Sequence, residues 1–234
     1  MSTVVLVHGG LHRPSCWDAV AAALADRGHA VITPDVPMDR EGTGAREWAR
    51  ASATAIDEDA RAPSRDDIVI VGHSIAGLCV PVVATMRAVR HMVFVGALLP
   101  VPGMTFVEHL GSSPGAITFP AFDAGGTGPF GLTWESVRDG FYHDCPSGIA
   151  REAFDQMRQQ DFTVFLERCP LTSWPDVPSS YIVLTDDRAV DGGWARHNAI
   201  RIGARVFELG GGHSPFYSRP AELASIVCEA IQPD

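Results

Sequence analysis

The stretch "VGHSIAG", residues 71–77, decides the fold, because it places a serine between a β-branched run and a helical pattern. A serine with a glycine two residues before it and another two residues after it is typical of a sharp strand-to-helix turn that exposes a nucleophile. Gly72 fits this pattern, whereas Ala76 adds a methyl group where the second glycine is expected. Two interpretations of Ser74 follow: it is a nucleophile, or it only caps the helix that comes next.

Short apolar runs alternate with longer helical patterns along the chain. Continuous β-branched runs without polar alternation are typical of strands buried on both faces of a parallel sheet. Strands are predicted at residues 3–8, 30–35, 67–72, 91–96, 181–186 and 204–209. Helices are predicted from Ser15 to Gly28 and at residues 43–60, 75–88 and 220–231. This order predicts the α/β class, with a mostly parallel, doubly wound sheet of about six strands.

The alternation stops between the fourth and the fifth predicted strands. A segment of this length needs structure of its own in a compact domain. Residues 134–142 and 147–160 have helical spacing, and the part before them is irregular and rich in glycine and proline. We expect residues 101–180 to form a small, mainly helical cap, inserted after the fourth strand of a core made of residues 1–100 and 181–234.

Composition restricts the function classes. The 234 residues are 46% apolar and carry a formal net charge of -10 without a lysine or arginine run, which argues against nucleic acid or a membrane surface as partner. Five cysteines without a C-x-x-C pair indicate reduced packing residues. The N-terminal stretch shows neither a signal peptide nor a membrane span, so we expect a cytoplasmic protein.

Two further motifs favour a nucleophilic Ser74. "GGGHSPF", residues 210–216, follows the last predicted strand, and "TDDRAV", residues 185–190, ends the strand before it. The chain order of serine, acid and histidine is the one that brings these groups together at the carboxyl edge of such a sheet. A serine needs a base to take its proton, and His213 is the candidate; the plain alternative is a loop histidine after three glycines. His73, beside the serine, is interpreted as a packing residue.

These blocks together resemble the α/β-hydrolases, most of all the branch of plant methylesterases, hydroxynitrile lyases and bacterial pyrethroid-type carboxylesterases. The resemblance covers the whole chain, from "VVLVHGG" (4–10) through "VGHSIAG", "FYHDCP" (141–146) and "YIVLTDD" (181–187) to "GGGHSPFYSRPAEL" (210–223). It implies the α/β-hydrolase fold and a serine carboxylesterase that cleaves a small ester through an acyl-enzyme, with no cofactor.

The resemblance also implies a role for further residues. It places the orienting acid at Asp187, the second carboxylate after the strand, with Asp186 and then Asp191 as alternatives. It assigns the N–H groups that stabilise the oxyanion to Ile75 and Gly10. Leu11, the next residue in the loop, is the alternative to Gly10. These N–H groups are expected to be held in position before negative charge develops on the carbonyl oxygen.

The aromatic residues of the predicted cap favour an apolar or aromatic ester. Most of them are expected to form the core of the cap, while some face the substrate. The expected pocket lining is Leu11, His12, Phe130, Trp134, Phe141 and Phe216. No H-E-x-x-H motif or paired His and Cys spacing is present, so no metal site is predicted.

Three other functions compete with an esterase. The related hydroxynitrile lyases carry a lysine after the catalytic histidine and a threonine after the histidine of the first strand; Ser214 and Gly9 stand there instead, which disfavours a lyase. A hydrolase or cyclase of a biosynthetic pathway, acting on a ketone, thioester or carbon–carbon bond, would use the same three residues. A ligand-binding protein on this scaffold would not need them. Either a monomer or a homodimer is compatible with the sequence.

Overall fold

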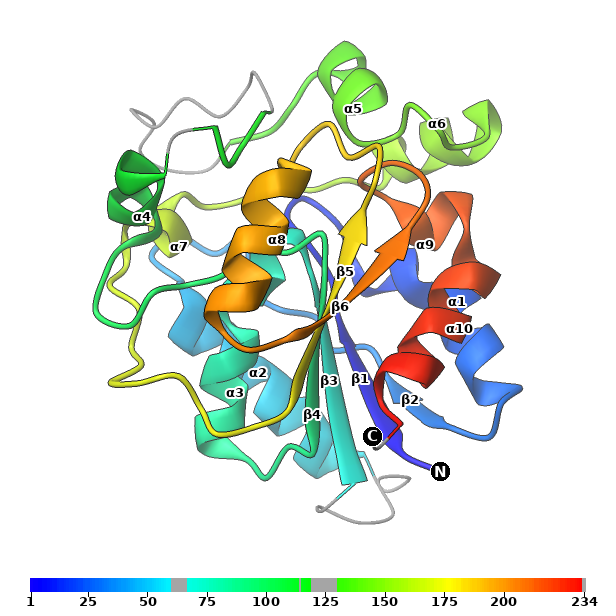
Figure 1. Ribbon diagram of the computed structural model, residues 1–234. Coiled ribbons are helices and arrows are strands. Elements are labelled where there is room, and N and C mark those ends of the chain that lie inside the picture. Colours follow the sequence, from blue (N-terminus) through cyan, green and yellow to red (C-terminus); the bar gives the residue numbers. More distant parts are fainter. Residues whose placement is uncertain (60–66, 114, 119–129, 233–234) are drawn as a thin grey trace.

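The computed structural model describes residues 1–59, 67–113, 115–118 and 130–232. Six parallel strands form one sheet in the order β2-β1-β3-β4-β5-β6 (Figure 1). The strands are β1 Thr3–Val7, β2 Ala30–Ile32, β3 Ile68–His73, β4 His91–Val95, β5 Ser179–Leu184 and β6 Arg205–Leu209. The predicted α/β class and parallel six-stranded sheet are confirmed.

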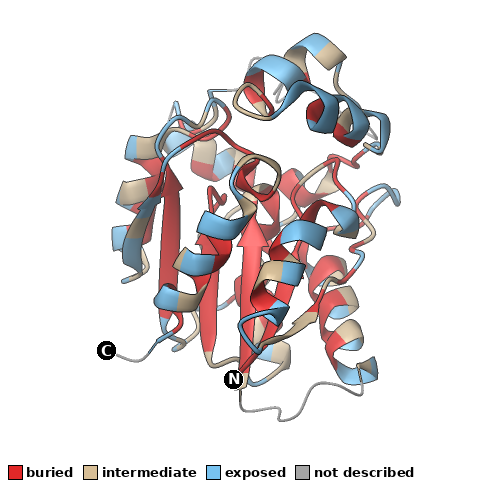
Figure 2. Ribbon diagram, turned by 90° about the vertical axis from the view of Figure 1, so that its right-hand side faces the viewer, coloured by how far each residue is buried: buried red, intermediate tan, exposed pale blue. Residues whose placement is uncertain are grey.

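Helices cover both faces of the sheet (Figure 1). One face carries α1 (Asp18–Ala25) and α10 (Pro220–Ala230), and the other carries α2 (Ala45–Glu58), α3 (Val80–Met86) and α8 (Gly192–Arg201). Side chains alternate between the two faces of a strand. In β1, Val4 and Leu6 accordingly join the core under α1 and α10, whereas Val5 and Val7 join the core on the opposite face. The four inner strands β1, β3, β4 and β5 are therefore buried along their whole length, as Figure 2 shows for the centre of the sheet.

Several predicted elements differ from the structure. The helix predicted at residues 147–160 ends at Asp155, and the one predicted at residues 75–88 is a 3-10 helix, Ser74–Leu78, followed by α3. β6 is one of the two edge strands, and its residues Arg205, Val206 and Glu208 are exposed, so the prediction that this run is buried on both faces is wrong. An edge strand has a neighbour on one side only, and its side chains are less completely covered. The first helix begins as a 3-10 helix, Pro14–Trp17, without a side-chain cap. The Ser15 hydroxyl donates to Gln156 Oε1 at 3.3 Å.

The segment between β4 and β5 holds four helices among its described residues: α4 Phe106–Ser112, α5 Trp134–Gly140, α6 Ser147–Asp155 and α7 Thr163–Leu166. α5 and α6 lie beyond the carboxyl ends of the strands (Figure 1) and share a small apolar cluster around Val137 and Tyr142. Phe106 of α4 and Phe165 of α7 instead join the core of the sheet. The expected irregular backbone at residues 119–129 lies outside the described residues.

The strand order reverses at β1, because β2 lies on one side of it and β3 on the other. Crevices that bind ligands form at such reversal points, where consecutive connections leave the sheet toward opposite faces. Val7 at the end of β1 pairs with Gly72 near the end of β3. The loop after β1 and the turn after β3 are therefore neighbours.

The described helices are short, and the longest, α2, has 14 residues. None of them is both long and apolar enough to cross a lipid bilayer. The expected cytoplasmic location, and the choice between monomer and homodimer, stay predictions.

Candidate active site

Ser74 lies on a sharp turn between β3 and a 3-10 helix, Ser74–Leu78. Its φ angle is +52°, which an L-residue adopts only under strain that the surrounding structure must support. Ser74 is the first residue of the helix, whereas the N-cap is His73, and no side chain caps this helix. The interpretation of Ser74 as a helix cap is therefore wrong.

Gly77 explains why the turn tolerates Ala76. The methyl group of Ala76 is fully buried in the core. A Cβ atom on Gly77 would collide with the Leu98 carbonyl oxygen and lie 2.9 Å from the Cβ of Ala97. The close approach that demands a glycine thus falls one residue later than the pattern predicts.

A continuous chain of hydrogen bonds joins the three predicted residues. The Ser74 hydroxyl lies 3.0 Å from Nε2 of His213, and His213 Nδ1 lies 2.8 Å from Asp187 Oδ2. The side chains of His213 and Asp187 are each 2% exposed. The second carboxylate oxygen, Asp187 Oδ1, accepts from the backbone N–H groups of Ala189 at 2.7 Å and Val190 at 3.1 Å.

The two alternative acids have other partners. Asp186 is exposed, and its carboxylate accepts from the Gly211 N–H at 3.1 Å. Asp191 caps α8 by accepting from the Trp194 N–H at 2.7 Å. The structure therefore brings Asp187, and neither alternative, to His213.

Three polar side chains hold the loop that carries His213. Asp186 binds Gly211, and Asp144, from the segment between β4 and β5, accepts from the Gly212 N–H at 2.9 Å. His73 donates from Nε2 to the carbonyl oxygen of His213 at 2.7 Å. Burial lowers the pKa of His73 well below its usual value, so this ring is neutral. His73 is thus buried, as a packing residue would be, and it also forms a hydrogen bond to the His213 loop that was not predicted.

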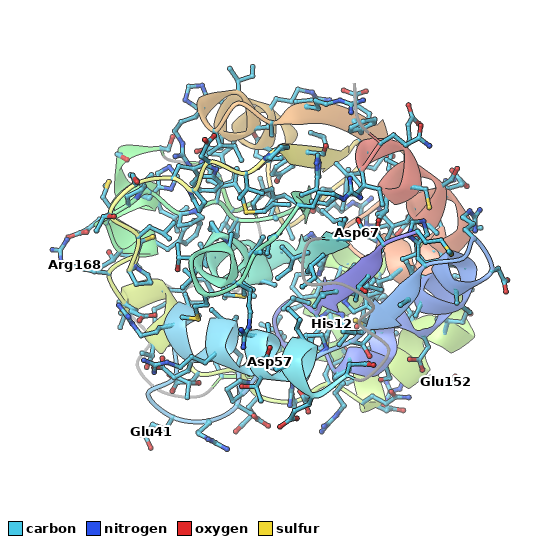
Figure 3. All side chains as sticks on the ribbon, turned by 90° about the horizontal axis from the view of Figure 1, so that it is seen from below. His12, Glu41, Asp57, Asp67, Glu152 and Arg168 are labelled. Atoms are coloured by element: carbon cyan, nitrogen blue, oxygen red, sulfur yellow. The ribbon has the colours of Figure 1, made fainter. Side chains whose placement is uncertain are left out.

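The side chain of His12 fixes the loop after β1. Leu11 has a φ angle of +65°. His12 Nδ1 donates to the Gly10 carbonyl oxygen at 2.7 Å, and Nε2 accepts from the Tyr142 hydroxyl at 2.9 Å. Burial lowers the pKa of His12 to about 3, so the ring stays neutral and keeps both bonds. His12 is 2% exposed and lies within the outline of the molecule in Figure 3, whereas the labelled Arg168 projects from that outline.

A cavity opens beside Ser74. Gly10 and Ile75, the predicted donors to an oxyanion, both line it, and Ile75 lies in the first turn of its helix, where N–H groups lack intrahelical partners. Of the predicted lining, Leu11, His12, Phe130 and Phe141 face the cavity. Further lining residues that the sequence did not single out are Leu98, Ile117, Leu132, Gln160, Phe165 and Val190.

Trp134 and Phe216, also predicted to line the pocket, lie elsewhere. Trp134 packs between α5 and α6, with its ring centroid 5.4 Å from that of Phe154 and 5.2 Å from the Arg151 guanidinium. Phe216 is 1% exposed and packs beneath the site against Trp17 and the ring of His73, at 5.2 and 4.9 Å between centroids. Both predictions rested on position in the chain, which does not give the direction of a side chain.

Among the described residues, no group of three or more His, Cys, Asp or Glu side chains is arranged to hold a metal ion. Asp144 and Gln160 were missed as site residues. The "FYHDCP" motif contains Asp144 and was a usable signal for it, whereas no local pattern marks Gln160.

A parallel sheet with a serine on a sharp turn after β3, hydrogen-bonded to a histidine that also binds an acid, defines an α/β hydrolase. The chain belongs to the alpha/beta hydrolase family, whose sequence model matches residues 4–226. The chain is 26% identical over 246 residues to a pyrethroid hydrolase of Sphingobium wenxiniae, covering 98% of this chain and 87% of the relative. It is 33% identical over 112 residues to a carbendazim hydrolyzing esterase of a Nocardioides species, covering 44% of this chain and 45% of the relative.

Solved structures share the fold. An extracellular alpha/beta-hydrolase from a Paenibacillus species superposes with a TM-score of 0.81 at 23% identity, over 98% of this chain and 99% of that one. A methylesterase protein from Arabidopsis superposes with a TM-score of 0.79 at 19% identity, over 99% of both chains. The sequence relatives are named hydrolases and esterases, so the predicted enzyme class, a carboxylesterase-type α/β hydrolase, is confirmed.

Proposed function

We propose that the protein is a serine esterase that cleaves a small apolar or aromatic carboxylic ester through an acyl-enzyme, without a cofactor. The observation that carries the proposal is the chain of hydrogen bonds from Asp187 through His213 to the Ser74 hydroxyl at the cavity. A serine hydroxyl is a weak nucleophile until a base takes its proton. His213 Nε2 lies within reach to do so.

The proposed reaction begins when Ser74 Oγ attacks the ester carbonyl and its proton passes to His213. The imidazolium that forms keeps its Nδ1–H on Asp187, which stabilises the charge and holds the productive tautomer. His213 then protonates the leaving alcohol, and the C–O bond breaks. In the second half, His213 takes a proton from the water that attacks the acyl-enzyme. His213 then returns a proton to Ser74 Oγ as the bond between Oγ and the acyl carbon breaks and the acid is released.

The tetrahedral intermediates carry negative charge on the former carbonyl oxygen. We assign their stabilisation to the backbone N–H groups of Gly10 and Ile75, with Leu11 as the alternative in the same loop. The bond from His12 to the Gly10 carbonyl oxygen and the burial of Ile75 favour this role, since donors aimed at an oxyanion must be held in place beforehand.

The lining of the cavity supports an apolar substrate. Phe130, Leu132, Phe141 and Phe165 come from the segment between β4 and β5. We therefore propose that residues 101–180 act as a cap that shapes the substrate pocket, while residues 1–100 and 181–234 supply the reacting groups. Among the described residues that line the cavity there is no lysine or arginine, so we propose a substrate without an acidic group at these positions.

The proposal is tested by hydrolysis of short p-nitrophenyl esters from pH 5 to 9. Ser74→Ala should abolish turnover, whereas Ser147→Ala, at an exposed serine of α6, serves as the matched control and should retain it. Activity should fall on the acid side, because a protonated base cannot accept the serine proton. A fluorophosphonate should label Ser74, as read by mass spectrometry of the peptide.

Equal turnover by the wild type and Ser74→Ala would contradict esterase chemistry at this serine. Labelling of another residue by the fluorophosphonate would contradict it as well. Equal, negligible turnover without labelling would favour a protein that binds its ligand on the hydrolase scaffold, whereas labelling of another residue would place the nucleophile elsewhere.

A further inference from the structure

Gln160 is a buried amide in an otherwise apolar part of the cavity. Its side chain lines the cavity and is 1% exposed. Its backbone pairs with that of Phe130 in both directions, at 2.8 and 2.9 Å, so its position is fixed. The amide nitrogen, Nε2, has no hydrogen-bond partner among the described residues. Buried polar groups are nearly always satisfied, so an unpartnered donor on a residue that lines a cavity points to a ligand atom.

The amide lies beside the loop after β1. A Cβ atom on Gly10 would collide with Gln160 Oε1, so the side chain occupies the space that a larger residue at position 10 would fill. The neighbouring Arg158 N–H donates to the Leu11 carbonyl oxygen at 3.0 Å, which ties this segment to the same loop. Gln160 is therefore held at the side of the cavity where Gly10 lies.

The other polar side chains of the cavity are already engaged. Both nitrogens of His12 have partners, and His73 uses its N–H on a carbonyl oxygen. Ser74 and His213 belong to the hydrogen-bonded chain. Among the described residues that line the cavity, Gln160 thus supplies the uncommitted side-chain N–H donor.

We propose that Gln160 is a specificity-determining residue whose Nε2 donates a hydrogen bond to an oxygen on the acyl side of the substrate, close to the scissile carbonyl. This inference rests on the proposed function. The leaving alcohol oxygen must face His213 to be protonated, whereas Gln160 adjoins Gly10, so the amide faces the acyl part. The substrate class is an ester with an α-oxygen substituent, such as an α-hydroxy, α-alkoxy or α-keto acyl group.

The test compares two isosteric esters, p-nitrophenyl methoxyacetate and p-nitrophenyl butyrate. They differ by one ether oxygen in place of a methylene group. The ratio of their kcat/KM values in the wild type is divided by the same ratio in Gln160→Met, which cancels their different intrinsic reactivity. Gln159→Met is the matched control, because Gln159 is the exposed neighbour.

We expect the ratio to fall about 3- to 10-fold in Gln160→Met, the range of one neutral hydrogen bond. Gln159→Met should leave the ratio unchanged. An unchanged ratio in Gln160→Met would overturn the inference. An equal loss for both esters would also overturn it, since Gln160 would then support the site without selecting the substrate.

A binding measurement separates this inference from the proposed function. In the Ser74→Ala background, calorimetry compares methoxyacetanilide with butyranilide, which bind without turnover. If Ser74→Ala binds the methoxy compound more tightly and Gln160→Met removes that preference, the role of Gln160 is supported even if the wild type hydrolyses no ester. Equal binding of the two anilides before the substitution would overturn it.

Discussion

Replacement of Asp187 by asparagine tests the proposed role of this acid, because it changes one carboxylate oxygen to an NH2 group. Asp187 Oδ1 accepts from two backbone N–H groups, those of Ala189 and Val190, at 2.7 and 3.1 Å. An asparagine must keep its carbonyl oxygen on these two donors, because its NH2 group cannot accept from them. The NH2 group is thereby directed at Nδ1 of His213, where Oδ2 of the acid stood at 2.8 Å.

This orientation reverses the tautomer of His213. Facing a donor, Nδ1 must give up its proton and accept, so the proton moves to Nε2, which then faces the Ser74 hydroxyl as a donor. The base can no longer take the serine proton. In other serine hydrolases built on these three residues, the same substitution lowers kcat about 10⁴-fold. At about 1.36 kcal/mol per tenfold, that is a rise of about 5.4 kcal/mol in the activation free energy.

The assay measures kcat for a p-nitrophenyl ester with Asp187→Asn beside Asp186→Asn. Asp186 is exposed, and an asparagine there can still accept from the Gly211 N–H, so its kcat should stay within about twofold. Thermal unfolding checks that both variants fold. The assignment would be refuted if Asp186→Asn lost more activity than Asp187→Asn, or if both lost equally little.

Three further results are expected. Gly77→Ala should lower the unfolding temperature by several degrees, because its Cβ would collide with the Leu98 carbonyl oxygen; overpacking costs about 1–3 kcal/mol, and 1 kcal/mol shifts a chain of this size by about 2–4 °C. Tyr142→Phe should lower the free energy of unfolding by about 1–3 kcal/mol in urea, since it strands the buried Nε2 of His12. Burial lowers the pKa of His12 to about 3, whereas an unfolded histidine titrates near 6.5, so below pH 6.5 the unfolded state binds the extra proton. The free energy of unfolding should therefore fall toward pH 5, and His12→Asn should remove about 1.4 kcal/mol per pH unit of that slope.

Local and topological patterns made the turn at Ser74 and the order of the three site residues predictable. The strand before Ser74 and the helical pattern after it are near in sequence, and parallel strands bring their carboxyl ends to one edge. α8 was not predicted, because it opens with Gly192 and Gly193 and buries Asn198 among its apolar residues, which breaks the periodic pattern. Gln160 depends on a pairing with Phe130 that no local pattern indicates.

The uncharged state of the histidines around the site has one electrostatic consequence for His213. In the proposed reaction His213 becomes an imidazolium, and the ring of His73 lies 4.7 Å from it between centroids. A second positive charge at that distance would oppose the first. Burial keeps His73 and His12 uncharged, while each still donates one N–H to a backbone carbonyl oxygen of the site, those of His213 and Gly10. Neutral imidazoles thus hold both halves of the site without raising the energy of the charge that the proposed reaction places on His213.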